Sequence, residues 1–166
     1  MQPALSVAVV SAAAWYRERL FWPVGVAGDA VLLPLGCGVV AFEVPLDRAA
    51  RVREALEHNG TRTAALFTRS PDKRVTFLAE ADGAVFGQHQ MPFGVRYLTV
   101  PVSLRLPLLV ASASRGASWF CAPDPAHRWF PCAAAVLAAV TAATPFALRA
   151  ATARPARPSR ERLLIG

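Results

Sequence analysis

Apolar residues recur along the chain with two periods, and each period predicts a different kind of element. A spacing of three or four residues predicts helices over residues 4–20 and 46–60, and an Ala-rich run predicts a third helix from about Cys132. Apolar runs rich in β-branched and aromatic residues predict strands instead. The predicted strands are residues 23–28, 30–36, 38–44, 63–69, 74–80, 94–104 and 116–123.

The faces of the two longer helices follow from the same spacing. In the first helix one face carries Leu5, Val9, Ala12, Ala13 and Tyr16. In the second helix the apolar positions are Ala50, Val52, Ala55 and Leu56. Asp47 is expected to act there as the N-cap or as a first-turn acid, and Asn59-Gly60 to end the helix.

Turn signals join several of the strands. Gly28-Asp29 links the first two, and "SPDK" (residues 70–73) links 63–69 to 74–80 as a hairpin, with Phe67 and Phe77 available for one face. Pro101 is expected to end or bulge the strand 94–104, because proline cannot donate to the ladder.

The strands cluster in runs rather than alternating with helices, which predicts an α+β fold: a single domain with a mixed, largely antiparallel sheet flanked by helices. A chain of 166 residues is long enough for one such core. We place the domain at residues 1–148. The Pro- and Arg-rich remainder, 149–166, is predicted to be a flexible basic tail.

The positive charge is unevenly distributed. The net charge is +7 and the pI is about 10.6. The tail holds Arg149, Arg154, Arg157, Arg160 and Arg162 against one acid, Glu161. Lysine occurs once, at Lys73. This excess of arginine indicates a GC-rich coding sequence as much as a selected function, so it favours nucleic-acid binding only weakly.

No segment of the sequence is expected to enter a membrane or to direct secretion. The Ala-rich run 132–148 is shorter than the roughly 20 residues of a span and contains Pro145. The N-terminal apolar stretch lacks a basic region before it. Cys37, Cys121 and Cys132 are odd in number and have no CxxC spacing, so we expect free buried thiols, no zinc site and a cytoplasmic protein.

Five strings carry further information through their order along residues 8–143. They are "WYRERLFWPVGVAG" (15–28), "GVVAFEVPLDRAARVREALEHNG" (38–60), "TRTAALFTRSPDKRVTFLA" (61–79), "VRYLTVPVSL" (95–104) and "GASWFCAPDPAHRWFP" (116–131). In this order they resemble the N-terminal domain of bifunctional DNA primase/polymerases, a branch of the archaeo-eukaryotic primase superfamily. Each string alone is a weak match, and the order carries the resemblance.

The resemblance implies a metal site from which parts are missing. The family places two acids at alternate positions of one strand, where both side chains can hold divalent metals for nucleotidyl transfer. Glu43 matches the first acid, Pro45 stands at the second, and Asp47 lies two residues further on. The family's Gly-rich turn is absent from residues 70–77, and Val75 stands where its nucleotide-contacting His would be. A third acid is also missing, since residues 94–101 offer only Arg96.

Three hypotheses follow. The first is a catalytically degenerate primase/polymerase-like domain that acts as a nucleic-acid-binding or regulatory interaction module, without metal or other cofactor, in replication or developmental control of a GC-rich bacterium. Its phosphate contacts would be Lys73, Arg74, Arg96, Arg154, Arg157, Arg160 and Arg162. The second is a residual Mg²⁺- or Mn²⁺-dependent nucleotidyltransferase that uses Glu43 and Asp47. The third is a protein-interaction scaffold that binds no nucleic acid.

Plainer interpretations exist for the same residues. Glu43 can be a strand-end carboxylate, exposed or paired with an arginine such as Arg48 or Arg74. The aromatic residues come in the adjacent pairs Trp15-Tyr16, Phe21-Trp22, Trp119-Phe120 and Trp129-Phe130. We expect one member of each pair in the core and the other partly buried, although bases can stack on any that are exposed.

Overall fold

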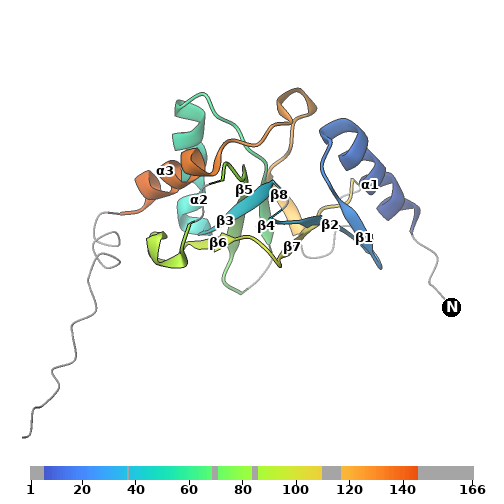
Figure 1. The fold of residues 1–166 in the computed structure, drawn as a ribbon, viewed down its shortest axis with the longest axis horizontal. Helices are drawn as coiled ribbons and strands as arrows, with labels where there is room; N and C mark the ends of the chain where they lie inside the picture. The colour runs from blue at the N-terminus through green and yellow to red at the C-terminus, as the bar shows by residue number, and fades with distance from the viewer. Residues whose placement is uncertain (1–5, 37, 69–70, 84–85, 110–116, 146–166) are drawn as a thin grey trace, which may run out of the picture.

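The computed structural model describes residues 6–36, 38–68, 71–83, 86–109 and 117–145. The helices in that part are α1 (Val7–Leu20), α2 (Leu46–His58) and α3 (Ala133–Ala143), with short 3₁₀ turns η1 (Gln88–Gln90) and η3 (Pro125–His127) (Figure 1). The strands are β1 (Gly25–Ala27), β2 (Ala30–Pro34), β3 (Val39–Pro45), β4 (Ala65–Thr68), β5 (Arg74–Glu80), β6 (Arg96–Leu98), β7 (Ser103–Leu106) and β8 (Ala117–Cys121). The predicted tail 149–166 and its domain boundary at residue 148 lie outside the described residues, as does Cys37.

The fold is a single-domain α+β arrangement, as the pattern predicted. The described strands form two antiparallel sheets rather than one: a three-stranded sheet in the order β1-β2-β7 and a five-stranded sheet in the order β6-β3-β5-β4-β8. The predicted strand 94–104 accounts for the difference. Its first part, β6, pairs with β3, and its second part, β7, pairs with β2. Pro101 lies between the two parts and has no N–H to continue a ladder.

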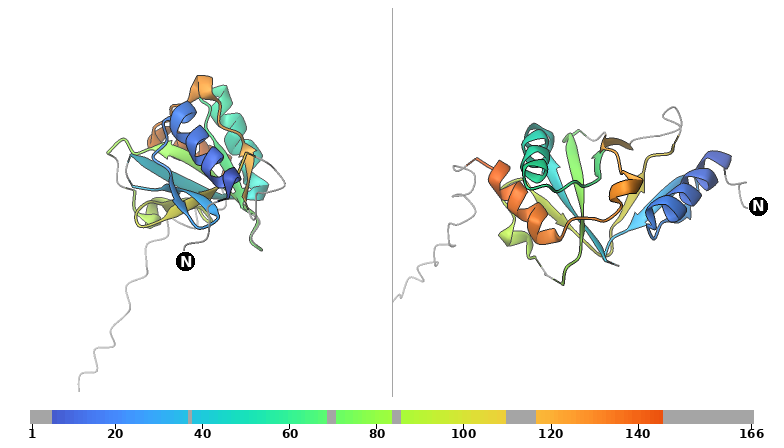
Figure 2. Two further views of the ribbon diagram at one scale, coloured as in Figure 1. Left: turned by 90° about the vertical axis from the view of Figure 1, so that its right-hand side faces the viewer. Right: turned by 90° about the horizontal axis from the view of Figure 1, so that it is seen from above.

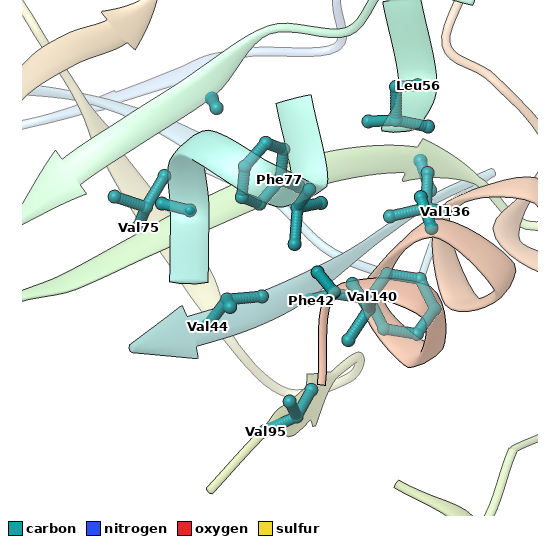
Figure 3. Close-up of a cluster of buried hydrophobic side chains, with 14 of the residues drawn as sticks. Phe42, Val44, Leu56, Val75, Phe77, Val95, Val136 and Val140 are labelled. Atoms are coloured by element: carbon teal, nitrogen blue, oxygen red, sulfur yellow. The ribbon is translucent and has the colours of Figure 1, made fainter. Parts of the chain in front are cut away.

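Two helices cover one face of the five-stranded sheet. Side chains alternate along β3, so Phe42 and Val44 point to the same side. They pack there with Phe77 of β5 and with Val136 and Val140 of α3, all buried (Figure 3). Seen from above, α2 and α3 lie on one side of this sheet and α1 lies on the other (Figure 2).

A second core covers part of the opposite face. Tyr16 of α1 stacks on Trp22 with ring centroids 5.7 Å apart, and its hydroxyl donates to the Pro107 carbonyl at 2.7 Å. These side chains pack with β2 and with Ala41 of β3. Glu43 follows two residues later on the same face of β3 as Ala41, and it is not part of either core.

The start of α2 confirms one of the two roles predicted for Asp47, that of a first-turn acid, and not the N-cap role. Pro45 occupies the N-cap position, and Asp47 is an exposed first-turn residue that makes no capping hydrogen bond. The buried face also differs: Ala50 is exposed, whereas Arg48 and Ala49 are buried together with Val52 and Leu56. Val52 and Leu56 were predicted correctly, and Arg48 lies on the same side of the helix at intervals of four residues, so the arginine is on the inner face.

Candidate functional site

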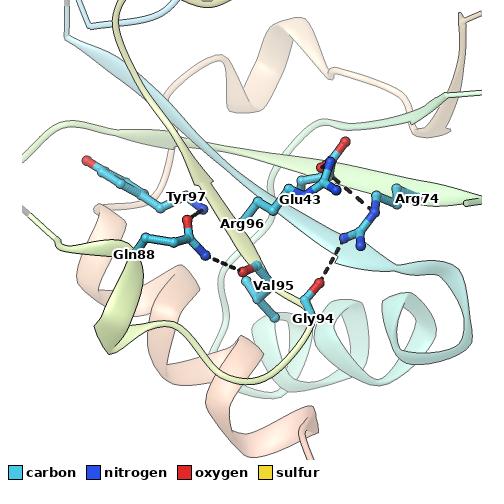
Figure 4. A network of polar contacts seen from close by, with 7 residues as sticks. All are labelled: Glu43, Arg74, Gln88, Gly94, Val95, Arg96 and Tyr97. Atoms are coloured by element: carbon cyan, nitrogen blue, oxygen red, sulfur yellow. Dashed lines mark hydrogen bonds and ion pairs between the residues drawn. The ribbon is translucent and has the colours of Figure 1, made fainter. Parts of the chain in front are cut away.

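Glu43 lies between two arginines. Its Oε2 atom is 3.3 Å from Arg96 Nη1 and 3.9 Å from Arg74 Nε (Figure 4). Strand register explains the contact, because Arg96 on β6 is directly opposite Glu43, and Arg74 on β5 is opposite Pro45. The sequence suggested that Glu43 pairs with an arginine such as Arg48 or Arg74. In the structure its partners are Arg74 and Arg96.

Arg74 and Arg48 both donate hydrogen bonds to the backbone just before β6. Arg74 Nη1 donates to the Gly94 carbonyl and Arg48 Nη1 donates to the Phe93 carbonyl, both at 2.8 Å. The Arg74 side chain is only 15% exposed. This arginine therefore fixes the entry into β6 and exposes little of its side chain to a ligand.

Gln88 completes the same network and was not predicted. Its side-chain amide donates to the Val95 carbonyl at 2.7 Å and accepts from the Tyr97 N–H at 3.1 Å (Figure 4). β6 is an edge strand of the sheet, so the amide satisfies backbone groups that would otherwise have no neighbouring strand. No local pattern signals this role.

Buried Arg48 was also missed, although its spacing held a signal. Arg48, Val52 and Leu56 follow at intervals of four residues, which puts all three on one helix face. Its guanidinium has no ion pair with any described residue and bonds to the Phe93 carbonyl and, at 3.4 Å, to Thr144 Oγ1.

We define the polar sheet face as Glu43, Arg74 and Arg96. Lys73 is exposed and precedes β5 with a left-handed φ of 41°. The side chain of Arg96 is 56% exposed. Two arginines against one carboxylate give this face an excess of positive charge, and the exposed Lys73 adds a cation at the chain position before Arg74. The four predicted tail contacts, Arg154, Arg157, Arg160 and Arg162, lie outside the described residues.

The chemistry of a two-metal site does not assemble on this face. Such a site needs carboxylates that converge on the same ions. Asp47 is an exposed residue of α2, and Pro45 occupies the alternate position on β3. Within the described ranges, no group of three or more His, Cys, Asp or Glu side chains is placed to hold a metal ion.

Two of the three cysteines, Cys121 and Cys132, lie in the described ranges. Cys121 is half-buried and Cys132 is exposed, so the expectation of buried thiols was wrong for the second. Both are free thiols. Burial raises the pKa of the Cys121 thiol, which is the reverse of what a nucleophilic cysteine needs.

Comparisons with protein-family models, with curated protein sequences and with solved structures found no match to this chain. No helix in the described part of the chain combines the length and the apolar content that crossing a membrane requires.

Proposed function

We propose that this chain is a nucleic-acid-binding module, primase/polymerase-like in fold, that does not transfer nucleotides. The arrangement around Glu43 carries the proposal. Glu43, at the position of the first metal ligand, forms ion pairs with Arg74 and Arg96. Pro45 offers no ligand at the second position.

Electrostatics supports nucleic acid as the partner. Arg96 exposes its side chain on the polar sheet face, Lys73 is exposed just before β5, and Glu43 neutralises only part of the charge. Phosphate groups are the usual partners of such lysines and arginines, and they supply most of the affinity that does not depend on base sequence. The basic tail would add further phosphate contacts. The free thiols are in keeping with a cytoplasmic location, which belongs to the same proposal.

The test is a titration of the full-length chain with single-stranded and duplex DNA, followed by fluorescence anisotropy at about 50 and 200 mM salt. Lys73→Ala and Arg96→Ala are expected to weaken binding, and each is expected to lower the salt slope by about 0.7–0.9 if one phosphate contact is lost. The control is Arg51→Ala, which removes an exposed arginine from α2. A variant with serine at the four predicted tail arginines measures the tail's share.

Two outcomes would overturn the proposal. Absence of binding at low salt would favour a protein-interaction scaffold. Nucleotide incorporation that requires Mn²⁺ or Mg²⁺ and is lost in Glu43→Gln would favour the residual nucleotidyltransferase. An equal effect of Arg51→Ala would show that binding follows net charge and does not depend on the polar sheet face.

A further inference from the structure

An exposed cluster of two aromatic rings and one guanidinium lies away from the polar sheet face. The Arg128 Cζ atom is 4.6 Å from the centroid of the Phe21 ring and 5.2 Å from that of the Trp129 ring. Phe21 is 68% exposed and Trp129 is 75% exposed. Phe21, Arg128 and Trp129 are called the aromatic–arginine cluster below. Exposed aromatic side chains of this size are costly in water, so their grouping around one cation suggests a ligand.

The inner neighbours of the two rings hold the cluster in place. Trp22 follows Phe21 and is buried, and Phe130 follows Trp129 and is half-buried. The Trp22 and Phe130 ring centroids are 5.0 Å apart. Trp22 thus lies in the core as predicted and Phe130 is half-buried, whereas Phe21 and Trp129 are exposed, not partly buried as predicted.

Two of the acids near the cluster, Glu57 and Asp124, are ion-paired, and a third, Glu80, is exposed. Glu57 pairs with Arg53 at 3.8 Å, and Asp124 pairs with His127 at 3.0 Å. Asp124 also accepts a hydrogen bond from the Ala126 N–H, and this bond is the largest cause that lowers the pKa of its carboxyl group.

Unlike Arg53 and His127, Arg128 has no acidic partner in the described part of the chain. In the described part of the chain no carboxylate lies within 4.0 Å of its guanidinium, whose Cζ atom lies over both rings. Stacking leaves the N–H edge of a guanidinium free to donate to an anion.

Hollows adjoin the cluster on two sides. One of about 380 Å³ is lined by Arg62 and Thr63 among others, and one of about 370 Å³ is lined by Phe21, Gly38 and Glu80 among others. Both include Trp22, Arg128, Trp129 and Phe130 in their walls. Each has the size of a small-ligand site. The Trp22 Nε1–H, buried in the shared wall, has no hydrogen-bond partner among the described residues.

We propose that the aromatic–arginine cluster binds an unpaired nucleotide, either free or within a single strand. The base stacks on the exposed ring of Trp129 or Phe21, and the phosphate accepts hydrogen bonds from the Arg128 edge. Every base has a π-face, so this recognition tolerates any sequence. A base inside a duplex has both faces covered by its neighbours, so the cluster selects single strands.

This site is separate from the polar sheet face. The second hollow reaches Val39 at the start of β3, whereas Glu43 lies four residues later, about 13 Å along the strand. Binding of a nucleotide within a single strand rests on the proposed function. Binding of a free nucleotide does not. Variants at one site can therefore be tested without altering the other.

The experiment uses the full-length chain and four probes: a labelled single strand, a duplex of the same sequence, AMP and inorganic phosphate. Anisotropy follows the two nucleic acids, and calorimetry follows the two small molecules. Trp129→Ala is expected to weaken single-strand binding about tenfold, which is the order of one lost base stack, and to leave duplex binding unchanged. Arg128→Ala is expected to weaken single-strand binding through the loss of a phosphate contact. Trp129→Phe should restore part of the affinity.

The control for a lost exposed aromatic side chain is Phe93→Ala, because Phe93 is 57% exposed and contributes only its backbone carbonyl to the Arg48 contact. Urea unfolding of every variant separates a lost site from a lost fold. AMP binding that depends on Trp129, with phosphate binding unaffected by its loss, supports binding of a free nucleotide.

Three results overturn the inference. The first is single-strand and AMP binding that is the same in Trp129→Ala, Arg128→Ala and the wild-type chain. The second is an equal loss for single strand and duplex. The third is absence of binding to both single strand and AMP. If Lys73→Ala and Arg96→Ala still weaken duplex binding in the first case, only the cluster is rejected and the proposed function stands.

Discussion

Replacing Glu43 with glutamine separates a metal ligand from an arginine partner. The substitution keeps the shape of the side chain and removes its charge. In the wild-type chain the carboxylate oxygen Oε2 lies near both Arg96 Nη1, at 3.3 Å, and Arg74 Nε, at 3.9 Å. If Glu43 were a catalytic ligand, its loss would weaken function. If Glu43 only neutralises two arginines, its loss should strengthen the binding of phosphate.

The cost in stability is expected to be small. The pair with Arg96 is partly exposed, and such pairs contribute about 0.2–1 kcal/mol. The contact with Arg74 is less exposed but long, and Arg74 keeps its hydrogen bond to the Gly94 carbonyl. We therefore expect Glu43→Gln to lower the free energy of unfolding by about 1 kcal/mol.

The gain in nucleic-acid affinity can be worked from the charge. The variant raises the charge of the polar sheet face by one and releases Arg96 for a phosphate. One added contact increases the salt slope by about 0.7–0.9. Over a fourfold change in salt, this makes the ratio of variant to wild-type affinity about threefold larger at low salt than at high salt.

Two measurements check this prediction: urea unfolding for stability, and anisotropy with labelled DNA at both salt concentrations. Glu54→Gln is the matched control, since it removes an exposed carboxylate from α2. Weaker DNA binding in Glu43→Gln, or an equal gain in Glu54→Gln, would refute the reasoning.

Two further predictions concern the supports of the fold. Gly94 has a φ of 77°, and an added Cβ would lie 2.7 Å from Arg48 Nη2. Gly94→Ala should therefore destabilise the protein by about 1–3 kcal/mol, measured by chemical denaturation. The control is Gly83→Ala, which should lose less stability because Gly83 has a φ of 79° but open space around it. Tyr16→Phe leaves the Pro107 carbonyl without its donor and should cost about 1–3 kcal/mol. Burial raises the pKa of Tyr16, so the hydroxyl stays protonated in the folded state while the unfolded chain ionises near pH 10. The free energy of unfolding should therefore fall as the pH rises above about 10, and a fall of the same size in Tyr16→Phe would contradict this assignment.

Local pattern was sufficient for most of the secondary structure. The buried run that forms β3 and the spacing that forms α2 lie within short windows, and their periods differ enough to separate strand from helix. Turn residues placed the β4–β5 hairpin in the same way. The α+β class followed from the order of these elements alone.

Only the tertiary structure decided which side chains meet. Glu43 and Arg96 are 53 residues apart and touch because β3 and β6 pair in one register. Trp22 and Phe130 are also far apart in sequence, yet their rings are in contact, and the neighbouring Phe21 and Trp129 lie around Arg128. Periodicity reports which face of an element is apolar, but not which distant element covers it, because that choice depends on sheet order and packing across the whole chain.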